Sequence, residues 1–212
     1  IRAFGAPAQV HNNCSGKHAG FLTLARHIGA GPDYIDPDHP VQRAVREAVE
    51  AMTGAPSPGH AIDGCSAPNF AVTLHGLARA MARFATAEEQ GTSARQRAAA
   101  RLVSAMAAHP LLVAGEGRAC TRLMRAMGGR AAVKTGAEGV FVAILPEQRL
   151  GIAVKIADGA SRASECVIAT LLARFGALDP ADPAVRAYSD AAILNRRGIE
   201  VGAIRPAATL RS

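Results

Sequence analysis

The spacing of apolar residues predicts a chain whose first part is mainly helical. Apolar positions recur with a period near 3.6 in several segments, as they do where one face of a helix is buried. The expected helices cover residues 15–28, 39–53, 70–84 and 93–109, with a shorter one near 121–127. A loop is expected from Pro56 to Pro68, after which Asn69 would cap the third helix, and Pro110 should block continuation of the fourth.

Beyond residue 130 the pattern changes to that of strands. Residues 132–136, 139–145 and 150–156 are rich in β-branched and apolar residues, and the last two segments are joined by a turn at Pro146–Arg149. A long apolar helix over residues 163–175 could cover the resulting sheet. The tail suggests a turn near Gly198 and a last edge strand at Val201. This order predicts an α+β fold, taken as one domain over residues 1–212.

Composition and charge exclude two classes of partner. The net charge is +7, but its arginines are scattered along expected helices without interleaved aromatic residues, so we expect solvated helix faces and no nucleic-acid partner. No run of 18 apolar residues exists, and we expect no membrane partner. The four cysteines of this chain are expected to be reduced thiols or metal ligands, as in a cytoplasmic protein.

Two loop-to-helix segments carry candidate metal ligands. In the segment from His11 to His18, Cys14 and Lys17 stand three residues apart at a helix start, so both side chains can lie on one face. A helix N-terminus favours a thiolate and disfavours a charged ammonium. Cys65, in the segment from Asp63 to Asn69, could join them around one ion, for which softness and size favour zinc. The alternative is two cysteines that act as small buried hydrophobes.

A third candidate is the triplet Lys134-Thr135-Gly136 at the start of the strand region. In penicillin-binding proteins and class A β-lactamases, a Lys-Thr-Gly triplet on a strand lines the active site. The strand, hairpin and C-terminal helix around it fit that context. A surface strand with a solvated lysine is the alternative interpretation.

Taken together, these segments resemble one family. The block from His11 to Gly20, the stretch from Asp63 to Pro68 and the stretch from Lys134 to Val140 are similar, in sequence and in order, to the rhizobial-type bacterial L-asparaginases II. The resemblance extends from Gln9 to about Gly202. It implies a serine β-lactamase-like fold, hydrolysis of L-asparagine to aspartate and ammonia, and a homodimer.

The resemblance also implies roles for individual residues. Zinc would be held by Cys14, Lys17 and Cys65, with a water in the fourth position. Asp63 would lie just outside the metal ligands, against that water or Lys17, and Lys134 would be a catalytic lysine that pairs with a serine. Thr135, beside Lys134, is a candidate for binding substrate. The remaining cysteines match no ligand position and are expected to be buried core residues, namely Cys120 and Cys166.

One part of the family pattern is absent. The family carries a Ser-x-x-Lys motif and a further catalytic serine ahead of the Cys-Ser-Gly-Lys block, whereas no serine of this sequence has a lysine three residues later. We therefore expect the chain to be the C-terminal two-thirds of an asparaginase domain, with its nucleophile outside these 212 residues. Two other functions stay open, a penicillin-recognising serine acyl-transferase and a non-catalytic zinc-binding remnant.

Overall fold

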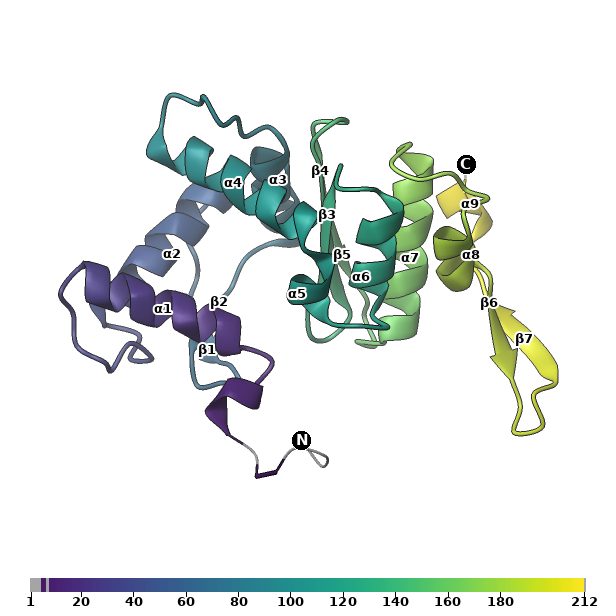
Figure 1. Ribbon diagram of the computed structural model, residues 1–212, viewed down its shortest axis with the longest axis horizontal. Coiled ribbons are helices and arrows are strands. Elements are labelled where there is room, and N and C mark those ends of the chain that lie inside the picture. Colours follow the sequence, from purple (N-terminus) through teal and green to yellow (C-terminus); the bar gives the residue numbers. More distant parts are fainter. Residues whose placement is uncertain (1–4, 7, 212) are drawn as a thin grey trace. The chain divides into compact units, whose positions relative to one another are not determined.

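The computed structural model describes residues 5, 6 and 8–211 (Figure 1). Contacts divide the chain into two compact units, one ending at Thr73 and the other beginning at Leu74. Each is mixed helix and strand, compatible with the expected α+β class. The single domain over residues 1–212 stays a prediction. Within the described residues, no helix is both long enough and apolar enough to cross a membrane.

The first unit contains two helices and a small hairpin. Its elements are η1 (Gln9–His11), α1 (Ser15–His27), α2 (Pro40–Thr53), β1 (His60–Ile62) and β2 (Pro68–Phe70). Both helices lie where the apolar period predicted them. They bury a small cluster made by Phe21, Ala25, Val41 and Ala67, against which Tyr34 and Cys65 pack.

The hairpin β1–β2 corrects one sequence expectation. Residues 68–70 form a strand and not the start of the third helix, which begins at Leu74. Asn69 is opposite Ala61 in the antiparallel register, and the Ala71 amide donates to the carbonyl of Gly59 beyond it. Asn69 therefore does not cap a helix. The backbone hydrogen bonds of this segment go to a partner strand that the local pattern did not reveal.

The second unit is built on a three-stranded antiparallel sheet. The elements before the sheet are α3 (Leu74–Ala85), α4 (Ala94–Ala108), α5 (Pro110–Ala114) and α6 (Ala119–Ala126). The sheet is β3 (Ala132–Thr135), β4 (Val140–Leu145) and β5 (Leu150–Lys155), in that spatial order. After it come α7 (Ser161–Arg174), α8 (Pro183–Ser189), the hairpin β6 (Ala191–Leu194) and β7 (Glu200–Ile204), and α9 (Ala208–Arg211).

The two faces of this sheet are covered by different helices (Figure 1). Side chains alternate along a strand, so the register places Phe141, Ile152 and Val154 on one face. There they join Ile168 and Leu172 of α7 in the main core. Gly151 lies on the opposite face, where α3 packs against β5. Lys134 is on that second face too, in a row with Val142 and Ala153.

The strands and the covering helix of this unit confirm the sequence predictions within one or two residues. Helix α4 ends just before Pro110, with Ser93 capping its start through the amide of Gln96. Four described elements of this unit were not expected, the short helices α5, α8 and α9 and the strand β6. The predicted edge strand at Val201 is half of the hairpin β6–β7. None of the four cysteines, all of which lie in the described part of the chain, forms a disulfide, and Cys120 and Cys166 are buried, as expected.

The approach of α3 to Gly151 yields a stability prediction. A Cβ at this position would overlap the α3 backbone around Ala78, Met81 and Ala82, so Gly151→Ala must push the helix off the sheet. We expect it to lower the free energy of unfolding by about 2 kcal/mol or more, the range of an overpacked core. Urea denaturation followed by circular dichroism measures this difference.

Gly202→Ala is the matched control. Gly202 is also a strand glycine, but the nearest atom to an added Cβ is 3.8 Å away, in the Ile193 side chain. Its effect on the free energy of unfolding should stay within about 0.5 kcal/mol. Equal stability of the two variants would show that α3 does not pack against β5 as described.

Candidate functional site

Cys14 caps the first helix in a way that leaves its thiol available. Its carbonyl accepts the amide of His18, the first hydrogen bond of α1, while its own amide donates to Asn12 Oδ1 at 2.8 Å. The Cys14 side chain makes no capping hydrogen bond to the helix amides. Lys17 is one turn further along α1, so the sequence spacing places the thiol and the amine at the same end of the helix.

Asp63 and Cys65 are held by the turn that joins β1 to β2. The Asp63 amide donates to the carbonyl of Ala67, and the Ser66 amide donates to the carbonyl of Asp63. Ser66 adopts a left-handed conformation, with φ of 73°, which lets the chain reverse. Asp63 Oδ1 accepts the Gly64 amide at 2.8 Å. The turn therefore fixes one carboxylate oxygen of Asp63 and leaves Oδ2 for contacts outside it.

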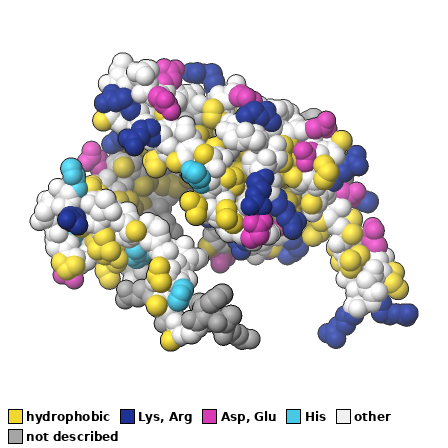
Figure 2. All heavy atoms as spheres, viewed as in Figure 1, with side chains coloured by type: hydrophobic (Ala, Val, Ile, Leu, Met, Phe, Trp, Pro, Cys, Tyr) yellow, Lys and Arg dark blue, Asp and Glu magenta, His cyan; other side chains and the backbone are white. Residues whose placement is uncertain are grey.

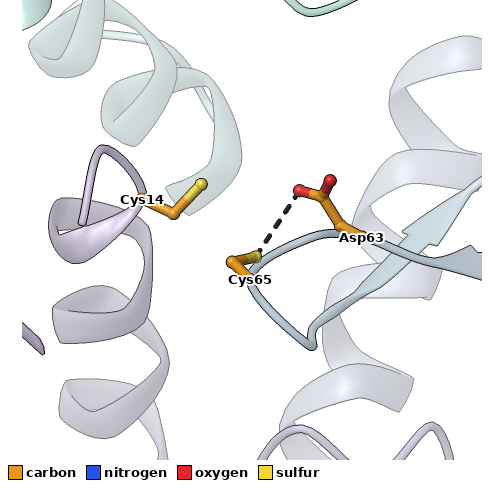
Figure 3. A group of neighbouring side chains, drawn as sticks. All are labelled: Cys14, Asp63 and Cys65. Carbon is orange, nitrogen blue, oxygen red and sulfur yellow. Dashed lines mark hydrogen bonds between the residues drawn. The ribbon is translucent and has the colours of Figure 1, made fainter.

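The helix start and the turn converge within the first unit. Lys17 Nζ donates to Cys65 Sγ at 3.2 Å and lies 3.6 Å from Asp63 Oδ2, while the Cys65 thiol donates to Asp63 Oδ2 at 3.5 Å. In Figure 3, Cys14 projects from α1 toward the turn that carries Asp63 and Cys65. The closest ligand atoms of these last three residues lie within 4.8 Å of one another.

Charge within this cluster sets its protonation without a metal. Burial, then a hydrogen bond with Cys65, raises the pKa of the Cys14 thiol, against the opposing charge of Lys17. For Lys17 the largest effect is desolvation, which lowers the pKa, but contacts with Cys65, Cys14 and Asp63 together outweigh it and hold that pKa above its ordinary value. The Gly64 amide, followed by Cys65, lowers the pKa of Asp63. Lys17 is thus an ammonium in the metal-free cluster.

The donor set of the cluster fits zinc. Two sulfurs, an amine and a carboxylate are the soft and borderline ligands that zinc accepts. Two thiolates about 2.3 Å from one tetrahedral zinc would be about 3.8 Å apart, so donors within 4.8 Å need only small movements to reach it. The cluster offers four groups, one more than the sequence suggested as direct ligands, because Asp63 lies as close as the thiols.

Lys134 and Thr135 belong to the second unit, at the end of the edge strand β3. Lys134 is exposed, and its Nζ donates to the carbonyl of Thr135 at 2.7 Å. The Thr135 hydroxyl donates to the carbonyls of Gly136 and Val140, which ties the strand end to the beginning of β4. The Lys-Thr-Gly triplet is therefore on an edge strand, with its lysine amine near the surface.

Sequence reasoning missed a contact that supports this strand. The Thr135 amide donates to Cys120 Sγ of α6 at 3.2 Å, although the sequence suggested only a core role for Cys120. Burial raises the pKa of that thiol, against the Thr135 amide and the charges of Lys134 and Arg118, so it stays protonated. No local signal pairs residues 120 and 135, since the contact arises from the packing of α6 beside β3.

A comparison with known proteins matches both the cluster of the first unit and the Lys-Thr-Gly strand of the second. No curated protein sequence matches the chain. A family model described as L-asparaginase II matches residues 1–206, which include the cysteine and lysine cluster of the first unit and the Lys-Thr-Gly strand of the second. Because the match covers nearly the whole sequence, the chain belongs to the L-asparaginase II family.

Proposed function

We propose that this chain is part of an enzyme that hydrolyses L-asparagine to L-aspartate and ammonia by a serine and lysine mechanism. Membership of the family implies an amidohydrolase and suggests asparagine as the substrate. The observation that carries the proposal to the level of residues is the convergence of Cys14, Lys17, Asp63 and Cys65, which come from two segments about 50 residues apart.

In this proposal Cys14, Lys17 and Cys65 hold a zinc ion, and Asp63 supports Lys17 or a water beside it. When bound, zinc would supply a fixed positive charge that attracts and orients the charged groups of asparagine. The protein contributes the preformed turn, the helix start and the hydrogen bonds that aim these side chains. Lys17 must give up its proton before its Nζ can act as a ligand.

Lys134 is the catalytic lysine of the proposal. Its amine is exposed at the end of β3. Among the described residues it makes only the local hydrogen bond to the Thr135 carbonyl, so it can turn toward a serine hydroxyl. There it would accept or return the proton of that hydroxyl. Thr135 would contact the substrate, because its hydroxyl and backbone lie next to the lysine on an exposed strand end.

The nucleophile is proposed to be a serine outside these 212 residues. No serine in the sequence is followed three residues later by lysine, the arrangement that activates a serine in enzymes of this kind. The serine oxygen would form a bond to the side-chain amide carbon of asparagine. The carbon–nitrogen bond would then break with transfer of a proton to the departing ammonia, and water would hydrolyse the acyl-enzyme to aspartate.

A serine β-lactamase-like fold is part of the same proposal. It is supported by the antiparallel sheet with the Lys-Thr-Gly triplet on an edge strand, and by a long C-terminal helix packed on that sheet.

We further propose a homodimer and a cytoplasmic location, where Cys14 and Cys65 would stay reduced. A penicillin-recognising acyl-transferase is the less favoured function, since such enzymes need no cluster of two thiols and an amine. Turnover of nitrocefin would reveal that function.

The activity prediction concerns Lys134. Lys134→Ala in the full gene product should lower kcat/KM for ammonia release from L-asparagine by about a hundredfold or more, since it removes a proton-transfer group. Lys155→Ala is a close control, because Lys155 is also an exposed strand lysine whose Nζ donates to the carbonyl of the next residue. Equal loss in both variants, or none in either, would contradict the role of Lys134.

The metal prediction concerns stoichiometry. The purified protein should contain about one zinc per chain, and Cys14→Ser or Cys65→Ser should abolish its retention because a thiolate ligand is lost. Cys166→Ala, which removes a buried thiol of α7 instead, should keep the zinc. Inductively coupled plasma mass spectrometry after dialysis gives the answer. Full zinc in the double Cys14→Ser, Cys65→Ser variant would disprove the site.

The pH dependence of zinc affinity tests the role of Lys17. The pKa values of Cys14 and Lys17 are raised in the metal-free protein, so both carry protons at neutral pH that binding must release. Zinc affinity should therefore rise with pH and fall as pH drops. In Lys17→Met that dependence should be less steep and the affinity lower, whereas Asp63→Asn should keep the steepness. Competition with a chelator from pH 6 to 9 measures both, and an unchanged Lys17→Met profile would exclude the amine as a ligand.

A further inference from the structure

The second unit contains a cavity that the proposed chemistry does not use. It has a volume of about 760 Å³ and lies between α7, α8 and the chain that follows β7. That size falls within the range of small-molecule sites in proteins. Its polar and charged lining consists of Thr170, Arg174, Arg186, Ser189, Asp190 and Arg205.

Two of the three arginines in this cavity are unpaired. Arg205 donates to Asp190, which joins the chain after β7 to the chain before β6 and closes the base of that hairpin. Arg174, the last residue of α7, and Arg186 of α8 have no side-chain hydrogen bond or ion pair to any described residue. The lining therefore carries two uncompensated positive charges, one on each of two helices.

The surface between the two unpaired arginines is partly apolar. Ala173 and Val185 line the cavity from α7 and α8, and the buried Pro206 lines it from the chain after β7. The hydroxyl of Thr170 is already used, because it donates to the carbonyl of Cys166. An occupant thus meets carbon surface together with guanidinium groups from two elements. A compact inorganic anion would use only part of this surface.

We propose that this cavity binds a small organic dianion, with two carboxylates on a short carbon frame. Each guanidinium would pair with one carboxylate in the planar two-bond geometry that arginine favours. The carbon frame would lie on the apolar surface between them. The Arg205–Asp190 pair holds the chain that follows β7 at the side of the cavity. This inference stands apart from asparagine hydrolysis, since none of these residues takes part in it.

The test is calorimetric titration of the purified protein with succinate at constant ionic strength. Succinate should bind with a dissociation constant of about 1 mM or tighter. Arg174→Gln and Arg186→Gln should each weaken binding about tenfold or more, the loss expected for one charge-assisted contact. Arg101→Gln is the matched control, because Arg101 is an exposed arginine of α4 outside the cavity and has no partner among the residues that the structure describes. This variant should bind succinate as the wild type does.

Three results would overturn the proposal. They are the absence of succinate binding at 10 mM, an equal loss in the Arg101→Gln control, and binding of inorganic phosphate as tightly as succinate. The last result would show a site that responds to charge alone. Circular dichroism of each variant, together with partial recovery of binding in Arg174→Lys, keeps a loss of binding distinct from a loss of folding.

Discussion

The contact between the start of α1 and the Asp63–Ala67 turn is the constraint on which the first unit's chemistry depends. Lys17 Nζ, 3.2 Å from Cys65 Sγ and 3.6 Å from Asp63 Oδ2, acts as an internal cation among groups that are negative or can become so. In the metal-free cluster, the positive charge of Lys17 therefore already balances the negative charge beside it. A bound zinc ion would take over the positive charge of the ammonium, which explains why proton release and metal binding must be linked.

Elements with a clear period were predictable from sequence, whereas those defined by a distant partner were not. Helix α2 has apolar residues at helical spacing, and β4 is an apolar run next to a turn, so both were located within one or two residues. The strands β1 and β2 have three residues each and no alternation, and Asn69 is also a common helix cap. Only the register between the two strands reveals them. The metal candidates were found because they lie in short, distinctive segments, while the nearness of Asp63 to both thiols required the turn geometry.

The proposed chemistry draws on both units. The first unit provides sulfur, amine and carboxylate donors from a helix start and a turn. The second provides the strand lysine Lys134, and the amide of the next residue, Thr135, donates to Cys120 Sγ. Basic side chains are not gathered into one patch on the face seen in Figure 2, where Lys and Arg are interspersed with Asp, Glu and apolar groups.

X-ray absorption at the zinc edge of the purified protein tests the central claim most directly, because it reports the atoms around the metal itself. The account predicts two sulfur neighbours at about 2.3 Å and two nitrogen or oxygen neighbours at about 2.0–2.1 Å, as expected for two thiolates, an amine and a fourth light-atom ligand. A zinc shell of nitrogen and oxygen alone, or one of four sulfurs, would contradict a centre held by Cys14, Lys17 and Cys65.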